Sequence, residues 1–164
     1  MERNVITLGR ITEKDRDAIA EIVTDKTVAK TYMLPDFTSD EQVYGLFRRL
    51  MELSNGKTRY VRGIYAGDTL FGFLNDVGID GGSVELGWVV HPECHNRGYA
   101  TEAAKLAIGE LFAAGFSEVV AGAFEGNAAS MRVMEKSGMT RLEKTDEIEY
   151  RGAVHRCVYY SIKK

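Results

Sequence analysis

Two hydrophobic periods alternate along the chain and divide it into strands and helices. Short apolar runs rich in β-branched residues are typical of strands, and longer runs with apolar residues three and four apart are typical of helices. We expect strands over residues 5–10, 59–66, 69–76, 83–90, 118–124, 139–144 and 154–162. We expect helices over residues 13–23, 38–55, 99–114 and 127–138. This order predicts one α/β domain over residues 1–164, with a mixed sheet and helices on both faces.

Turn and capping residues mark the ends of several of these elements. Gly67-Asp68 is typical of a hairpin turn between two strands. Asn127 is placed to cap the start of the last helix, and Gly115 to end the helix before it in the left-handed conformation. A polar loop is expected over residues 146–152, whereas residues 26–37 give no clear pattern.

The strand over residues 83–90 leads into the following helix through a short turn that carries the first functional signal. The turn reads His95-Asn96-Arg97-Gly98-Tyr99-Ala100, with a glycine where the helix begins. The first N–H groups of a helix have no partner within the helix, and the positive end of its dipole lies there. Such a turn can hold phosphate, so we expect a cofactor that carries a diphosphate.

Composition excludes several other classes of function. The net charge of −3 and pI near 5.7 give no general attraction to nucleic acid. No apolar run approaches the roughly 18 residues that span a membrane, and residues 1–7 lack the apolar core of a secretory signal. Two cysteines are too few for a disulfide framework. We therefore expect a cytoplasmic protein with reduced thiols.

The histidines and cysteines raise the question of a metal site. His91, Cys94 and His95 form one cluster, and His155 and Cys157 form another. Zinc uses these ligand types, but the spacing matches no usual structural zinc pattern. We expect no metal.

The turn and a second motif together resemble the GNAT superfamily of acetyl-CoA-dependent N-acetyltransferases, and within it the RimJ/RimL-like branch. The superfamily's acyl-CoA motif is Gln/Arg-x-x-Gly-x-Gly/Ala, and here it is the turn from His95 to Ala100. The second motif is Asn127-x-x-Ser130-x-x-x-x-Glu135-Lys136-x-Gly138. The order of elements agrees along nearly the whole chain. The resemblance implies a mostly antiparallel twisted sheet of about seven strands flanked by about four helices.

The resemblance assigns a binding role to each part of these motifs. Backbone amides of the turn would hold the diphosphate of acetyl-CoA. Because the contact is made by the backbone, histidine can stand at position 95 in place of Gln or Arg. One strand would pair with the pantetheine amides. The residues assigned to the cofactor are Val89, Val90, His95, Asn96, Arg97, Gly98, Tyr99, Ala100, Thr101, Asn127 and Lys136.

Acetyl transfer also needs a base for the amine and an acid for the departing thiolate. Glu85 is the candidate base, acting directly or through water, and its alternative is a solvent-facing carboxylate on a strand. Many family members carry a Tyr as the acid, seven residues after the motif Asn, and Met134 stands there. The resemblance assigns that role to Ser130, which could equally be an ordinary residue in the first turn of the helix.

The predicted function is transfer of an acetyl group from acetyl-CoA to a primary amine, on a protein N-terminus or a small molecule, in a ternary complex. Aminoglycosides and polyamines are alternative acceptors, and a non-catalytic acyl-CoA-binding module is an alternative from another class. Dinucleotide and P-loop motifs are absent from the sequence. A monomer and a homodimer both remain open. Acidic residues in the two loops expected to line the acceptor site favour a cationic acceptor: Asp36, Asp40, Glu41, Asp146, Glu147 and Glu149.

Overall fold

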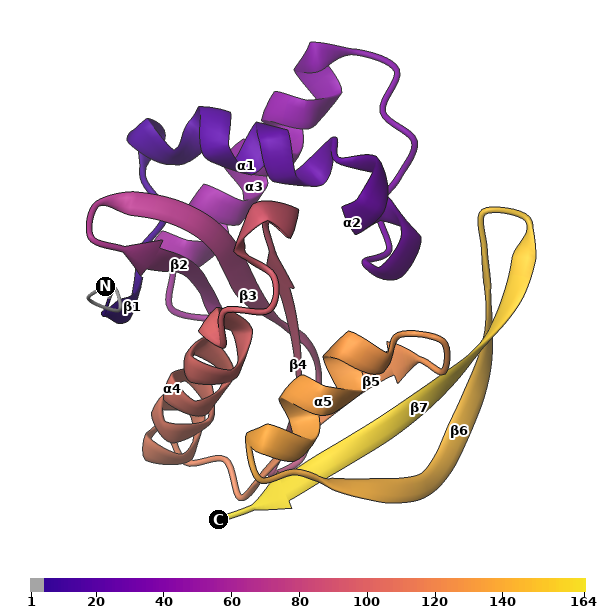
Figure 1. Ribbon diagram of the computed structural model, residues 1–164. Coiled ribbons are helices and arrows are strands. Elements are labelled where there is room, and N and C mark those ends of the chain that lie inside the picture. The colour runs from indigo at the N-terminus through magenta and orange to yellow at the C-terminus, as the bar shows by residue number, and fades with distance from the viewer. Residues whose placement is uncertain (1–4) are drawn as a thin grey trace.

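The computed structural model describes residues 5–164, which form a seven-stranded sheet with helices on both sides (Figure 1). Residues 1–4 belong to the stretch from which we expect no secretory signal, and they lie outside the described residues. The sheet has the strand order β1-β2-β3-β4-β5-β7-β6. The pair β4–β5 is parallel and the other five pairs are antiparallel. The predicted mixed, mostly antiparallel sheet is therefore confirmed, whereas a single domain over residues 1–164 stays a prediction.

The elements follow the predicted order with one addition. The strands are β1 (Ile6–Gly9), β2 (Val61–Ala66), β3 (Thr69–Asp80), β4 (Ser83–Val90), β5 (Glu118–Phe124), β6 (Thr140–Tyr150) and β7 (Ala153–Lys163). The helices are α1 (Arg16–Val23), α2 (Lys26–Thr31), α3 (Asp40–Asn55), α4 (Tyr99–Ala113) and α5 (Ala128–Lys136). Two 3-10 turns, Glu13–Asp15 and Pro92–Cys94, precede α1 and α4.

Two cores lie on opposite faces of the sheet. Helices α1, α2 and α3 cover one face, and α4 and α5 cover the other (Figure 1). Adjacent strand residues point to opposite faces, so Phe73 of β3 is buried among α1 and α3 while Leu74 packs toward α4. Consecutive residues of these strands are apolar, without alternation, because both faces of the strands are buried.

Strands β4 and β5 pair over a short length and then separate. Their register joins residues Ser83 to Glu85 with Glu118 to Val120 and ends there. On its other side, β4 continues in register with β3 as far as Val90, interrupted by one additional β3 residue between Asp76 and Gly78. One edge of the later part of β4 is therefore open toward β5.

Helix α2 and the end of the last hairpin differ from the prediction. Asp25 caps α2 by accepting from the N–H groups of Thr27 and Val28, a local signal that the weak apolar pattern concealed. The polar loop expected over residues 146–152 is wrong, because β6 pairs with β7 as far as Tyr150. A two-residue turn closes this hairpin, with φ of 51° at Arg151 and 77° at Gly152, as short hairpin turns require.

Two capping predictions are confirmed in the structure. The Oδ1 atom of Asn127 accepts the N–H of Ser130 at 3.1 Å, and Gly115 ends α4 with φ of 110°. Each satisfies backbone groups that a helix end leaves without partners.

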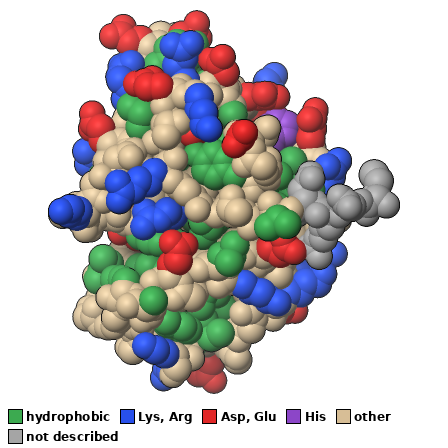
Figure 2. All heavy atoms as spheres, turned by 90° about the vertical axis from the view of Figure 1, so that its left-hand side faces the viewer, with side chains coloured by type: hydrophobic (Ala, Val, Ile, Leu, Met, Phe, Trp, Pro, Cys, Tyr) green, Lys and Arg blue, Asp and Glu red, His purple; other side chains and the backbone are tan. Residues whose placement is uncertain are grey.

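The helices and one face of the surface bear on the expectations from composition. Within residues 5–164, no helix has both the length and the apolar composition needed to cross a membrane. Figure 2 shows the side that bears β1 and α4, where acidic and basic side chains alternate.

Close contact between β3 and β4 generates a prediction about stability. A Cβ atom at Gly72 would lie 2.4 Å from the carbonyl oxygen of Val89 and 3.2 Å from the Cα atom of Val90. Gly72→Ala should therefore lower the free energy of unfolding by about 1–3 kcal/mol, the usual cost of overpacking. Urea unfolding measures the change, and Gly78→Ala is the control, since a Cβ there meets nothing within 4 Å. Equal midpoints for the two variants would contradict the prediction.

Candidate active site

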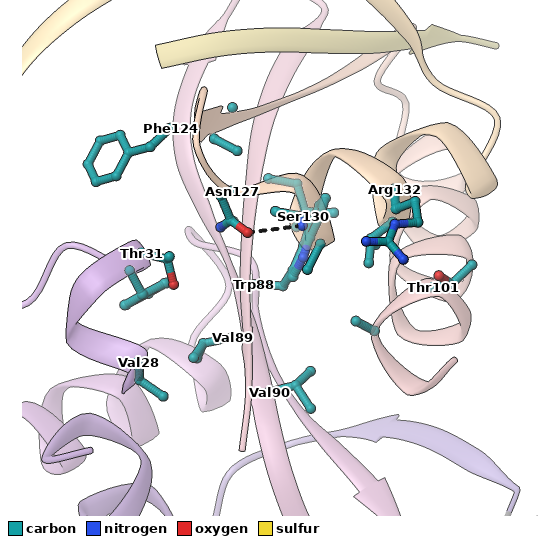
Figure 3. A pocket seen from close by; sticks show the side chains of 18 of the residues that line it. Val28, Thr31, Trp88, Val89, Val90, Thr101, Phe124, Asn127, Ser130 and Arg132 are labelled. Atoms are coloured by element: carbon teal, nitrogen blue, oxygen red, sulfur yellow. Dashed lines mark hydrogen bonds between the residues drawn. The ribbon is translucent and has the colours of Figure 1, made fainter. Parts of the chain in front are cut away.

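A cavity of about 630 Å³ lies where β4 and β5 separate. Its walls come from α2, β3, β4, the turn before α4, the start of α4, β5, α5 and the β6–β7 hairpin. Figure 3 shows Trp88, Val89 and Val90 along β4 in the middle of this space, with Thr101 and Arg132 on one side and Val28 and Thr31 on the other. Segments far apart in the chain therefore meet around the open edge of one strand.

The turn before α4 has the backbone conformation of an anion-binding loop. Asn96 and Gly98 have φ of 64° and 78°, and α4 begins directly after them. All the turn residues assigned to the cofactor line the cavity except Arg97. Its side chain is exposed to solvent and is not part of the cavity lining. The first N–H groups of α4 point out of the helix there. The expected contribution of the His95 N–H is not available, because it donates to the Pro92 carbonyl at 3.2 Å.

Helix α5 forms the wall opposite the turn. Asn127 and Ser130 both line the cavity, and the hydroxyl of Ser130 has no hydrogen-bond partner within residues 5–164. Met134 is fully buried in the core and has no contact with the cavity. A hydroxyl at the cavity wall is therefore supplied by Ser130.

Two cations on α5 add positive charge to this side of the cavity. Lys136 lines it, as the resemblance implied, and so does Arg132, one helical turn earlier (Figure 3). Sequence analysis missed Arg132, although its spacing of four from Lys136 places both on one helix face. Together with the free N–H groups at the start of α4, they form a site suited to an anion with several charges.

Glu85 lies at the point where the two strands part. It is the last residue of β4 that pairs with β5, and its half-buried side chain lines the cavity. Burial raises the pKa of the Glu85 carboxyl, Lys144 lowers it and Asp146 raises it again. A carboxylate with a raised pKa is a stronger base than one in water, and this favours the interpretation of Glu85 as a base over that of an ordinary surface carboxylate.

The far wall of the cavity is held together by the tip of the β6–β7 hairpin. The hydroxyl of Tyr150 donates to the Ala29 carbonyl at 2.5 Å and accepts from the N–H of Leu34 at 3.2 Å. Arg151 forms an ion pair with Asp36. These bonds join the hairpin to α2 and to the segment that follows it, more than a hundred residues away in the chain.

The acidic residues expected around the acceptor do not line the cavity. The carboxylate of Asp36 is paired with Arg151, and that of Asp146 accepts the hydroxyl of Tyr159 at 2.8 Å. Tyr159 itself is buried and lines the cavity. The expectation that these residues line the site is therefore wrong, whereas a cationic acceptor stays a prediction.

The histidines have other partners than a metal. The ring of His91 lies with Nε2 3.0 Å from Glu21, while its Nδ1 accepts the N–H of Glu93 at 3.1 Å. His155 stacks on Phe124 with ring centroids 4.5 Å apart. Among residues 5–164, no group of three or more His, Cys, Asp or Glu side chains could hold a metal ion.

Comparison with known proteins relates this site to acetyltransferases. The family model of the acetyltransferase (GNAT) domain matches residues 6–140. A curated relative from Bacillus subtilis (strain 168), the uncharacterised N-acetyltransferase YoaA, is 27% identical over 170 residues, which span 100% of this chain and 96% of the relative.

Solved structures share the fold over nearly the whole chain. A GNAT-family acetyltransferase from Bacillus anthracis is 26% identical with a TM-score of 0.84, covering 98% of this chain and 96% of that one. RimL, a ribosomal L7/L12 α-N-protein acetyltransferase in complex with coenzyme A, has a TM-score of 0.85 and 15% identity, covering 98% and 95%. At that identity, the likeness to RimL shows the fold alone.

The raised pKa of Glu85 predicts how its replacement changes stability with pH. Burial favours the neutral carboxyl, so its contribution to stability is full below the unfolded-state pKa and is lost as the pH rises through the folded-state pKa. Glu85→Gln should therefore gain in unfolding free energy relative to the wild type between pH 4 and pH 8.

Urea unfolding at the two pH values measures this difference. Glu52→Gln, an exposed carboxylate on α3, is the control and should show a smaller change with pH. A difference between Glu85→Gln and the wild type that stays constant or shrinks as the pH rises would contradict the prediction.

Proposed function

The chain belongs to the GNAT family of acetyltransferases, and on that basis we propose that it transfers the acetyl group of acetyl-CoA to a primary amine within a ternary complex. The observation that carries this proposal is the separation of β4 from β5 at Glu85, which opens a strand edge beside the start of α4. The acceptor is an N-terminal amine of a protein or a small-molecule amine. The motifs at His95–Ala100 and Asn127–Gly138 support the RimJ/RimL-like branch.

Acetyl-CoA fits this cavity along the open edge of β4. The backbone at Val89 and Val90 pairs with the pantetheine amides as an added strand would. The carbonyl of Val89 faces Gly72 of β3, so Val90 supplies the groups on the open edge, where its carbonyl oxygen lies 3.0 Å from His95 Nε2. The diphosphate lies against the first N–H groups of α4, from Gly98 onward, with Arg132 and Lys136 opposite. The side-chain oxygen of Asn127 is used in capping α5, and this leaves its N–H groups to donate to pantetheine.

The chemistry then follows from the residues at the parting of the strands. Glu85 takes a proton from the ammonium group of the acceptor, directly or through water, and so exposes the nitrogen lone pair. The nitrogen attacks the thioester carbonyl carbon, a C–N bond forms, the C–S bond breaks, and the nitrogen loses its second proton to water. Ser130 gives its hydroxyl proton to the departing thiolate and regains one from solvent, and Glu85 releases the first proton to solvent.

Both cysteines at the cavity support direct transfer rather than an acetyl-enzyme. Cys94 and Cys157 line the cavity, and burial raises the pKa of each thiol. The thiolate is the nucleophilic form of cysteine, and a raised pKa keeps its population low. The amine itself is therefore the nucleophile.

Thermal unfolding with acetyl-CoA, and with NAD and ATP as controls, tests the cofactor. Acetyl-CoA alone should raise the melting temperature, since a ligand at a hundredfold excess over its Kd stabilises the folded state by about 2.7 kcal/mol. Release of CoA that depends on an added amine then tests the reaction. No shift with acetyl-CoA, or a larger one with NAD or ATP, would overturn the cofactor. Binding without release across a broad amine panel would favour the non-catalytic module.

Replacement of Ser130 tests the proposed acid. Ser130→Ala should reduce the single-turnover rate of acetyl transfer by about 10²-fold, the lower end for general acid catalysis, because a thiolate leaves readily even without a proton. Acetyl-CoA affinity should change little. Ser130→Thr keeps a hydroxyl at the same position and is the matched control. A chemical rate in Ser130→Ala equal to that of the wild type would remove the assignment.

A further inference from the structure

The half of the cavity that lies away from the anion site is walled by apolar and neutral side chains. Figure 3 shows Val28, Thr31 and Phe124 on the side opposite Thr101 and Arg132. Asn75 and Val77 of β3 line the cavity as well. Since the cofactor's phosphates require the cations on α5, this other half is the space for the acceptor.

Glu85 shares one face of the sheet with Asn75 and Val77. Residues two apart on a strand point to the same face, so Glu85 and Gly87 lie on one side of β4. A Cβ atom at Gly87 would lie 3.2 Å from Val77 Cγ2 and 3.6 Å from Asn75 Oδ1. The glycine therefore lets the side chains of Val77 and Asn75 pack closely over β4, two residues along the same face from Glu85.

Asn75 is held in place by Tyr32, the residue that follows α2. The hydroxyl of Tyr32, just after that helix, donates to Asn75 Oδ1 at 2.8 Å, and the Tyr32 ring packs edge-on against Phe73 with centroids 5.8 Å apart. Burial raises the pKa of Tyr32, so its hydroxyl keeps its proton and remains a donor. The acceptor space therefore has the neutral amide of Asn75 at this position. An aspartate would have nearly the same shape there but would carry a negative charge.

Glu85 is the only carboxylate among the residues of 5–164 that line the cavity. Neighbouring acids have other partners or point away. Asp36 pairs with Arg151, and Asp146 accepts from Tyr159. Glu147 and Glu149 flank Ile148, which lines the cavity, so alternation along β6 directs both to the other face. The charges of Asp146 and Lys144 also act on Glu85, but they are opposite in sign and lie 4.0 Å apart. The lining itself therefore offers one negative charge, that of Glu85, to an ammonium group.

The mouth of the acceptor space is apolar. Met33 and Val77 line it and are 53% and 55% exposed. An acceptor with an apolar body would cover these side chains and gain from their removal from water. A second ammonium group at the same place would leave these side chains in water and gain no counter-charge from the lining.

We propose that the acceptor is a primary amine with a single positive charge and an apolar body, and that Asn75 determines this specificity by excluding a second cation. This inference rests on the proposed function. The required chemistry could come from a free apolar amine or from a peptide whose N-terminal residue is apolar.

Rates with matched amines test the proposal. Pentylamine and 1,5-diaminopentane differ only in the second ammonium group, and a leucine-ended peptide without other cations tests the peptide source. The wild type should prefer pentylamine to 1,5-diaminopentane by about tenfold or more in kcat/KM. Asn75→Asp, nearly identical in shape, should reduce that preference by about tenfold because it supplies the second carboxylate.

Gln42→Glu is the matched control for added charge. Gln42 is exposed in the first turn of α3, where its Oε1 accepts the Thr38 N–H at 2.8 Å, and a glutamate keeps that bond. This variant should leave the preference unchanged. A higher kcat/KM for the peptide than for pentylamine would assign the peptide source, and the reverse would assign the free amine; either supports the proposal.

Calorimetry with the protein–CoA complex separates this proposal from the reaction itself. Tighter binding of pentylamine than of 1,5-diaminopentane, without turnover, would keep the specificity and overturn the proposed catalysis. Equal or better use of 1,5-diaminopentane or spermidine by the wild type would overturn the specificity. So would an unchanged preference in folded Asn75→Asp.

Discussion

The separation of β4 from β5 is the constraint on which the rest of this structure depends. A strand buried in a sheet must pair its backbone N–H and C=O groups, and leaving them buried without partners is costly. Beyond Glu85, β4 has no β5 partner, yet Val89 and Val90 are almost fully buried. The open edge is tolerable because His95 Nε2 lies 3.0 Å from the carbonyl oxygen of Val90, and because a cavity adjoins the edge, where water or an extended ligand can pair with the remaining groups.

Close packing around this opening keeps it in shape. Gly72 allows β3 to approach the carbonyl of Val89, so β4 is pressed from its paired side. On the other side of the gap, a Cβ at Gly122 of β5 would lie 2.8 Å from the ring of Tyr159. The absent side chain at Gly122 lets this ring fill the wall. Glycine thus permits, on both strands, contacts that any larger residue would disturb.

Charge is divided between the two halves of the cavity. Arg132 and Lys136 face the start of α4, where helix N–H groups already favour anions. Glu85 lies at the other end, where burial raises its pKa and the neighbouring walls are neutral or apolar. One cavity can therefore hold a polyanionic cofactor and a cationic acceptor without either entering the other's place.

The sequence by itself determined the local elements and the turn that leads into α4. Hydrophobic period predicted the strands and four of the helices, and Gly98 with the helix after it predicted the anion site, because these signals lie within a few neighbouring residues. Tertiary structure alone decided what contacts across the chain create: the course of β6 to Tyr150, the position of Arg132 and the cavity wall around Asn75. A polar strand forms when a partner strand supplies its hydrogen bonds, and a side chain faces a cavity only when distant segments enclose one. Neither condition can be inferred from the residues that are neighbours in the sequence.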